Sequence, residues 1–190
     1  MLLFGHAGIT LGAAALAARA ASKRGTDRSE KTSWFAPLAR YVDIRLLVIG
    51  SLLPDIIDKP VGQYFFRETF FNGRIFAHTL FLLVLITAAG YYLYRRRKQL
   101  WLLTLAAGTF THLVFDEMWQ VPGTLFWPLM GFHFAKHDLT DWFPNILKAL
   151  LSSPYIYISE AIGLAIVIWF AVWVILQKKV GAFIRHGKIY

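Results

Sequence analysis

The chain has 190 residues, of which 57% are hydrophobic and only 16% are charged, and its formal net charge is +9. Soluble domains usually carry about 25% charged residues. This composition, with a mean hydropathy of +0.50, therefore excludes an ordinary soluble protein and predicts an all-α integral membrane protein, with one domain over residues 1–190. The chain has no cysteine, so disulfides and thiolate ligands are excluded and any metal must be held by His and carboxylate side chains.

The cations lie in three short clusters beside apolar runs. These clusters are Lys23/Arg24/Arg28, residues 95–98, and Lys178/Lys179 with Arg185/Lys188. Such clusters are typical of the cytoplasmic ends of membrane helices, whereas nucleic-acid binding is expected from a continuous basic patch or tail. We therefore expect no nucleic-acid partner, and we expect a protein of the cell inner membrane with the three clusters facing the cytoplasm.

Five apolar segments are predicted as membrane helices, in the order 2–21, 38–53, 77–94, 100–119 and 155–176. The first lacks the positively charged start of a signal peptide and has Arg19 where a cleavage site needs small residues, so we expect it to be retained. Within it, Gly8 and Gly12 have the spacing that lets another helix approach closely. The second segment is short for a span, and Pro54 is expected to end or break it.

Short interfacial or re-entrant segments are expected between these helices. Residues 22–33 form a basic loop, residues 34–41 lead into the second helix at the interface, and residues 59–73 form an aromatic interfacial loop. The stretch 121–134 contains two prolines and two glycines, which favours a re-entrant or surface loop. Residues 139–152 are predicted to form an amphipathic helix that lies in the interface.

Charge alone orients the five helices. With the basic clusters inside, the outer ends of the helices carry His6, Asp55, Asp58, His78, His112, Asp116 and Glu160. Ionisable residues at membrane depth are costly and are kept mainly where they pair, bind an ion or line a cavity. Their arrival on one face predicts a metal site at the extracytoplasmic interface.

Helical spacing brings ligand-type side chains together in pairs. His112 and Asp116 are four residues apart and share a helix face, so an imidazole nitrogen and a carboxylate oxygen can point at one ion. Asp55 and Asp58 are three residues apart and can do the same or bridge two ions. Two ions would hold the attacking and leaving oxygens of a phosphoryl displacement.

His78 and His6 would complete the ligand set, which suits zinc, manganese or iron. Arg74 would lie one helical turn before His78 and could hold a carboxylate of the site or a substrate phosphate.

Each of these residues also has a simpler interpretation. The alternatives are a hydrogen-bonded His6, a helix cap at Asp55, an Asp58–Lys59 ion pair, an interfacial anchor at Arg74, a His112–Asp116 hydrogen bond, and a pair of Glu160 with Arg45 or Lys136. A second set, His133 and His137 with Asp138 and Asp141, is interpreted as a solvated loop or the rim of the site. If the simpler interpretations were all correct, these unrelated polar residues would have reached the same membrane face by coincidence. A shared metal site explains their common location better.

The order of these motifs resembles a known family. His6, GSLLPDIID (50–58), RIFAHTLF (74–81), HLVFD (112–116) and the Trp-Pro loop FWPL (126–129) are similar to the LexA-regulated, membrane-bound metal-dependent hydrolases, the YdjM-like proteins. The resemblance covers most of residues 1–130 and extends more loosely through SEAIGL (159–164). It implies that His6, Asp55, Asp58, His78, His112 and Asp116 are metal ligands, and that the fold is distantly similar to zinc-dependent phospholipase C. The chain departs from the family pattern around His78, where Thr79 replaces an expected Ser but keeps the hydroxyl.

We therefore expect a membrane-bound hydrolase that uses one or two divalent ions, zinc first, with Asp55, Asp58, Arg74 and His78 as its catalytic residues. A lipid phosphoester is the expected substrate, because the site lies at headgroup depth beside aromatic loops that could admit an amphiphile. Two alternatives remain. A divalent-metal transporter would need a polar path to the cytoplasm, and a non-catalytic scaffold with a structural metal would need a site closed by four ligands.

Overall fold

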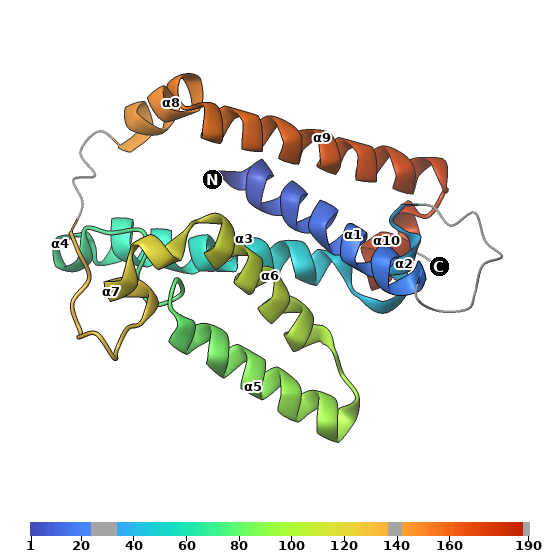
Figure 1. Cartoon of the computed structure of the whole chain (residues 1–190), viewed down its shortest axis with the longest axis horizontal. Coiled ribbons are helices and arrows are strands. Elements are labelled where there is room, and N and C mark those ends of the chain that lie inside the picture. Colours follow the sequence, from blue (N-terminus) through green and yellow to red (C-terminus); the bar gives the residue numbers. More distant parts are fainter. Residues whose placement is uncertain (24–33, 137–141, 188–190) are drawn as a thin grey trace.

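The computed structural model describes residues 1–23, 34–136 and 142–187, and every regular element among them is a helix. The elements are η1 (Gly5–Ile9), α1 (Thr10–Lys23), α2 (Ala36–Tyr41), α3 (Ile44–Pro60), η2 (Val61–Phe65), α4 (Arg67–Phe70), α5 (Leu80–Arg97), α6 (Trp101–Phe115), η3 (Met118–Gln120), α7 (Pro122–Leu125), α8 (Trp142–Ser152), α9 (Pro154–Leu176) and α10 (Val180–His186). The predicted all-α class is confirmed. In Figure 1 the N-terminus, α4, α7 and α8 lie at one end of the molecule, and α2 and α10 lie at the other.

Among the described residues, one helix is long and apolar enough to cross a membrane, namely α9 with 23 residues. Helix α6 is apolar but has 15 residues, and α5 has 18 residues of which the last three are arginines. By length and composition, the structure therefore supports one of the five predicted membrane helices.

Helix α3 continues through Pro54 to Pro60, so the prediction that Pro54 ends or breaks this helix was wrong. A proline has no N–H, which leaves the carbonyl four residues earlier without its helical partner. Here that carbonyl belongs to Gly50, and Thr109 of α6 donates its hydroxyl to it at 3.2 Å, in a hydrogen bond shared with the Leu105 carbonyl at 3.1 Å. The contact with α6 thus satisfies the backbone at the proline, and the helix extends far enough to carry Asp55 and Asp58.

The backbones of α3 and α6 touch at two glycines. A Cβ added at Gly50 would lie 2.2 Å from the carbonyl oxygen of Leu105, and one added at Gly108 would lie 2.3 Å from that of Leu47. Only a residue without a Cβ permits this approach. The close contact places His112, one turn beyond Gly108, against the second half of α3.

Helix α9 packs against the start of the chain in a similar way. A Cβ added at Gly8 would lie 2.0 Å from the carbonyl oxygen of Gly163, and one added at Gly12 would lie 3.0 Å from the side chain of Ile166. The close helix approach that the glycine spacing predicted is therefore confirmed, with α9 as the neighbouring helix.

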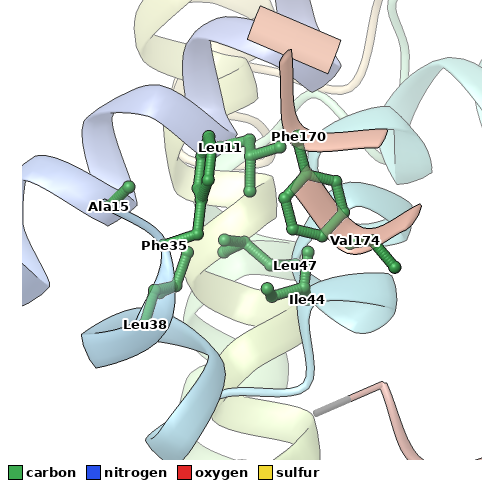
Figure 2. Close-up of a cluster of buried hydrophobic side chains, with 8 residues drawn as sticks. All are labelled: Leu11, Ala15, Phe35, Leu38, Ile44, Leu47, Phe170 and Val174. Carbon is green, nitrogen blue, oxygen red and sulfur yellow. The ribbon is translucent and has the colours of Figure 1, made fainter. Parts of the chain in front are cut away.

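A hydrophobic core joins four helices (Figure 2). It consists of Leu11 and Ala15 of α1, Phe35 just before α2, Leu38 of α2, Ile44 and Leu47 of α3, and Phe170 and Val174 of α9. Phe35 is fully buried, and burying a side chain of this size stabilises a fold by about 1.5–3 kcal/mol. Segment 34–41, predicted as an interfacial lead-in, thus contributes directly to the packed core.

Candidate metal centre

Five side chains of the ligand type meet at one point of the fold. They come from four segments and are His6 of η1, Asp55 of α3, His78 before α5, and His112 and Asp116 of α6 and its C-terminal end. These residues form two overlapping sets, His6/Asp55/His112 and His78/His112/Asp116. Within each set, the ligand atoms all lie within 4.8 Å of one another. The prediction that the Asp55/Asp58 end of one helix meets the His112/Asp116 end of another is confirmed.

Two of the histidines face each other through the same ring atom. The Nε2 atoms of His78 and His112 lie 3.1 Å apart, and both rings are fully buried. On the far side of each ring, Nδ1 meets an acceptor at 2.7 Å, which is Asp58 Oδ2 for His78 and the carbonyl oxygen of Ser51 for His112. An acceptor at Nδ1 requires the proton there, so each neutral ring turns an unprotonated Nε2 toward the other.

Two unprotonated nitrogens cannot hydrogen-bond to each other, and their lone pairs repel unless a proton or a metal ion lies between them. Zinc binds imidazole nitrogen at about 2.0–2.1 Å, so nitrogens 3.1 Å apart are close enough to share one ion. The residues present therefore fit a metal, and they fit it with the tautomers that metal-binding histidines usually adopt.

The carboxylates surround this pair. Asp55 Oδ1 lies 3.7 Å from His78 Nε2, and Asp116 Oδ2 lies 4.0 Å from the same atom and 3.9 Å from His112 Nε2. The simpler interpretation paired Lys59 with Asp58, but Lys59 forms its ion pair with Asp55 at 2.6 Å. Asp55 and Asp116 thus lie on the side of the two histidines where the Nε2 atoms meet.

Asp58 lies behind His78 and not at its Nε2. Its two oxygens accept hydrogen bonds from the backbone N–H groups of Ile75, Ala77 and His78 and from His78 Nδ1, at 2.7–3.1 Å, and the residue is fully buried. The sequence placed Asp58 beside Asp55 as a ligand. The structure places it where it orients the His78 ring.

The same hydrogen bonds explain why His78 does not lie in a helix. Helix α5 begins at Leu80, and Thr79 caps it by accepting a hydrogen bond from the Leu82 N–H at 3.1 Å. Before the helix, the N–H groups of residues 75, 77 and 78 donate to Asp58 and so do not form helical hydrogen bonds. The expected start at residue 77 and the helical spacing of Arg74 and His78 were therefore wrong. Arg74 nevertheless reaches the site, since its Nη2 lies 2.7 Å from Asp116 Oδ2.

His6 completes the group from the start of the chain. Its ring stacks on that of His112 with centroids 4.1 Å apart, and its Nε2 lies 3.1 Å from Asp116 Oδ1. That pair is not aligned as a hydrogen bond, and within the described part of the chain neither ring nitrogen of His6 has a hydrogen-bond partner. Within the described residues, His6 therefore faces Asp116 through Nε2 at 3.1 Å without the hydrogen bond of the simpler interpretation, and its Nδ1 has no partner.

Three other expectations concern residues around the site. Glu160 pairs with neither Arg45 nor Lys136, because its carboxylate accepts hydrogen bonds from backbone N–H groups at the start of the chain. His133 is exposed and is not part of either ligand set, whereas His137, Asp138 and Asp141 lie outside the described residues. The role of the Ser51 carbonyl was not predicted, since a backbone oxygen leaves no signal in side-chain spacing.

Two cavities open beside the cluster. One, of about 310 Å³, is lined by Met1, Leu2, Arg74, Asn145, Ile146, Ala149 and Ile156. The other, of about 230 Å³, is lined by Met1, Arg74, Phe115, Asp116, Glu117, Gln120, Val121, Tyr155 and Ile156. Arg74 borders both and Asp116 borders the second, so the cluster has an open side that is apolar on the face formed by α8 and α9.

Comparison with known proteins gives one result. A family model described as YdjM inner membrane protein matches residues 1–182. No curated protein and no solved structure matches the chain, so no likeness to zinc-dependent phospholipase C is shown.

Proposed function

This chain belongs to the YdjM inner membrane protein family, and on that premise we propose that it is a membrane-bound, metal-dependent hydrolase acting on a phosphoester of a lipid or another amphiphile. The observation that carries the proposal is the buried His78–His112 pair, whose Nε2 atoms face each other at 3.1 Å. Such a pair calls for a cation between the rings.

The proposed ligands are His6, His78, His112, Asp55 and Asp116, with zinc as the first choice of ion and manganese or iron as alternatives. Asp58 and the Ser51 carbonyl hold the two facing rings in position. A zinc ion bound there supplies a Lewis acid for a phosphoryl oxygen and makes water a stronger nucleophile near neutral pH.

The substrate class follows from the open side of the cluster. Arg74 is 43% exposed and borders both cavities, where its guanidinium can bind phosphate oxygens with two parallel hydrogen bonds. Leu2, Ile146 and Ile156 line the adjoining cavity and suit an acyl chain. A substrate that places a phosphate at Arg74 and an apolar tail in the adjoining cavity would be a phosphoester of a lipid.

The rival functions have less support. A divalent-metal transporter needs a polar path across the protein, but hydroxyls near the cluster are engaged within the chain, as in Thr10 with Thr111 at 2.9 Å and Thr109 with the Gly50 carbonyl. A structural metal is closed by four protein ligands, whereas Arg74 and Asp116 border a cavity here.

Purified protein tests the proposal directly. We expect it to contain zinc or a related ion, to release water-soluble phosphate compounds or diacylglycerol from phospholipid vesicles, to lose this activity to a chelator and to regain it when zinc is added. Protein that holds its metal but hydrolyses no phosphoester would contradict the hydrolase proposal. Zinc uptake by protein-containing vesicles would point to transport instead.

We also propose that the five helices predicted from the sequence span the inner membrane, with the basic clusters in the cytoplasm and the metal centre on the extracytoplasmic side. Because the chain has no cysteine, single cysteines can be labelled without background. Arg97→Cys, at the end of α5, is expected to react with a membrane-impermeant thiol reagent only after the cells are opened. The exposed Met130 provides the control, since Met130→Cys should react in intact cells. The reverse pattern would invert the orientation.

A further inference from the structure

Glu160 is a buried carboxylate that the proposed reaction does not use. It lies in the first third of α9, the helix that is long and apolar enough to span a membrane, and it is only 9% exposed. An ionisable residue inside such a helix is costly, and it is usually retained for a specific task. The question is therefore what this carboxylate holds.

Its partners are backbone groups at the start of the chain. Oε1 accepts hydrogen bonds from the N–H groups of Leu2 at 2.7 Å and Gly5 at 3.0 Å, and Oε2 accepts one from Phe4 at 2.9 Å. The first N–H groups of a helix have no partner within it, and Phe4, at the N-cap, offers no side-chain cap to η1. Glu160 provides this cap from another helix, with a charge that suits a helix N-terminus.

The turn that Glu160 caps carries His6. This ring is held differently from the other two histidine rings, because Nδ1 of His78 and of His112 each meets an acceptor, while neither nitrogen of His6 has a hydrogen-bond partner in the described residues. The direction of the His6 ring must therefore come from its stacking on His112, from the contact of its Nε2 with Asp116 Oδ1 at 3.1 Å and from the position of its backbone. Glu160 holds that backbone, together with the contact of the Met1 ammonium with Asp116 Oδ1 at 3.0 Å and the close contact of Gly8 and Gly163.

We propose that Glu160 is the positioning residue for His6, and that it sets the metal affinity of the centre by holding the turn from which His6 enters. The inference rests on the proposed metal centre. Residues that orient metal ligands typically change metal affinity by about 10–100-fold when they are replaced. We expect a loss in this range for Glu160→Ala, because the released turn lets His6 swing away from the other ligands.

A double-mutant cycle on the detergent-purified full chain tests this proposal. The zinc dissociation constant is measured for the wild type, Glu160→Ala, His6→Ala and the double variant. If Glu160 acts through His6, its replacement weakens binding in the wild type but has no further effect once His6 is gone. If Glu160 only stabilises the fold, its replacement leaves the zinc dissociation constant unchanged. If Glu160 affects zinc binding by a route that does not involve His6, the two losses multiply, since changes without a shared partner are additive in free energy. Either of these results would overturn the proposal.

Two further variants complete the test. Phe170→Leu lies on the same helix, in the core of Figure 2, and is expected to lower the melting temperature without changing zinc affinity. Glu160→Gln keeps the shape and one acceptor oxygen, should weaken binding less than Glu160→Ala, and gives the same cycle if Glu160→Ala does not fold. Wild-type protein that takes up no zinc would contradict the metal centre itself, and with it this inference. Multiplying losses in a protein that does bind zinc would contradict only the role of Glu160.

Discussion

Replacing His78 or His112 with alanine is expected to abolish zinc binding, and phosphoester hydrolysis with it. Each substitution removes one of the two Nε2 atoms that face each other at 3.1 Å. Changes to residues that only orient a ligand already cost about 10–100-fold in metal affinity, so loss of the ligand itself should exceed that range. The measurement is zinc content after purification, followed by a zinc titration of the metal-free protein.

The metal-free proteins provide an internal check on this result. Without zinc, the two lone pairs of the facing nitrogens repel, so removing one ring should not destabilise the metal-free protein as much as the loss of a filled core position usually would. Zinc should raise the melting temperature of the wild type, because a ligand that binds only the folded state stabilises it, and it should leave that of His78→Ala unchanged.

His133→Ala is the matched control, because His133 is exposed and lies outside both ligand sets. It should keep full zinc content and activity. Loss of zinc in His133→Ala together with retention in His78→Ala would show that the metal centre had been placed at the wrong histidines.

The second large effect is expected at Asp58, where Asp58→Asn should both weaken zinc binding and destabilise the protein without zinc. The buried carboxylate accepts hydrogen bonds from three backbone N–H groups and from His78 Nδ1. An amide supplies one acceptor oxygen and turns an NH₂ group toward donors. Hydrogen bonds to a charged group contribute about 1.5–3 kcal/mol each, so we expect a loss of about 3 kcal/mol in the free energy of unfolding.

Asp55→Asn distinguishes the role of Asp55 from that of Asp58, which lies on the same helix. Asp55 faces His78 Nε2 and pairs with Lys59 in a partly exposed position. Its replacement should therefore weaken zinc binding but leave the thermal unfolding of the metal-free protein nearly unchanged. Unfolding followed by tryptophan fluorescence, with and without chelator, measures both variants. If Asp55→Asn destabilises the metal-free protein and Asp58→Asn does not, the roles assigned to them are reversed.

Much of the site was predictable because it depends on residue type and on charge. The basic residues after three of the apolar runs indicate which end of each helix faces the cytoplasm. This assignment alone predicted that His6, His78 and the His112/Asp116 pair lie together at the opposite ends of the helices. The all-α class follows from composition in the same way. These features are properties of single segments and need no knowledge of how the segments pack.

The prediction failed where a hydrogen bond joins segments that are distant in the sequence. Local rules end a helix at Pro54, but the Gly50 carbonyl that the proline leaves free is satisfied by Thr109, 59 residues after Gly50. Local spacing makes Asp58 a ligand equivalent to Asp55, but the backbone of residues 75–78 folds over its carboxylate and turns it into a support for His78.

Glu160 is the strongest case of the same effect, since its partners lie 155–158 residues earlier in the chain. The sequence by itself determined which side chains could hold a metal and that they lie at one end of the helices. The tertiary structure decided which of them point at one another and which stand behind, because a buried polar group takes whichever partner the packed backbone brings within hydrogen-bond distance.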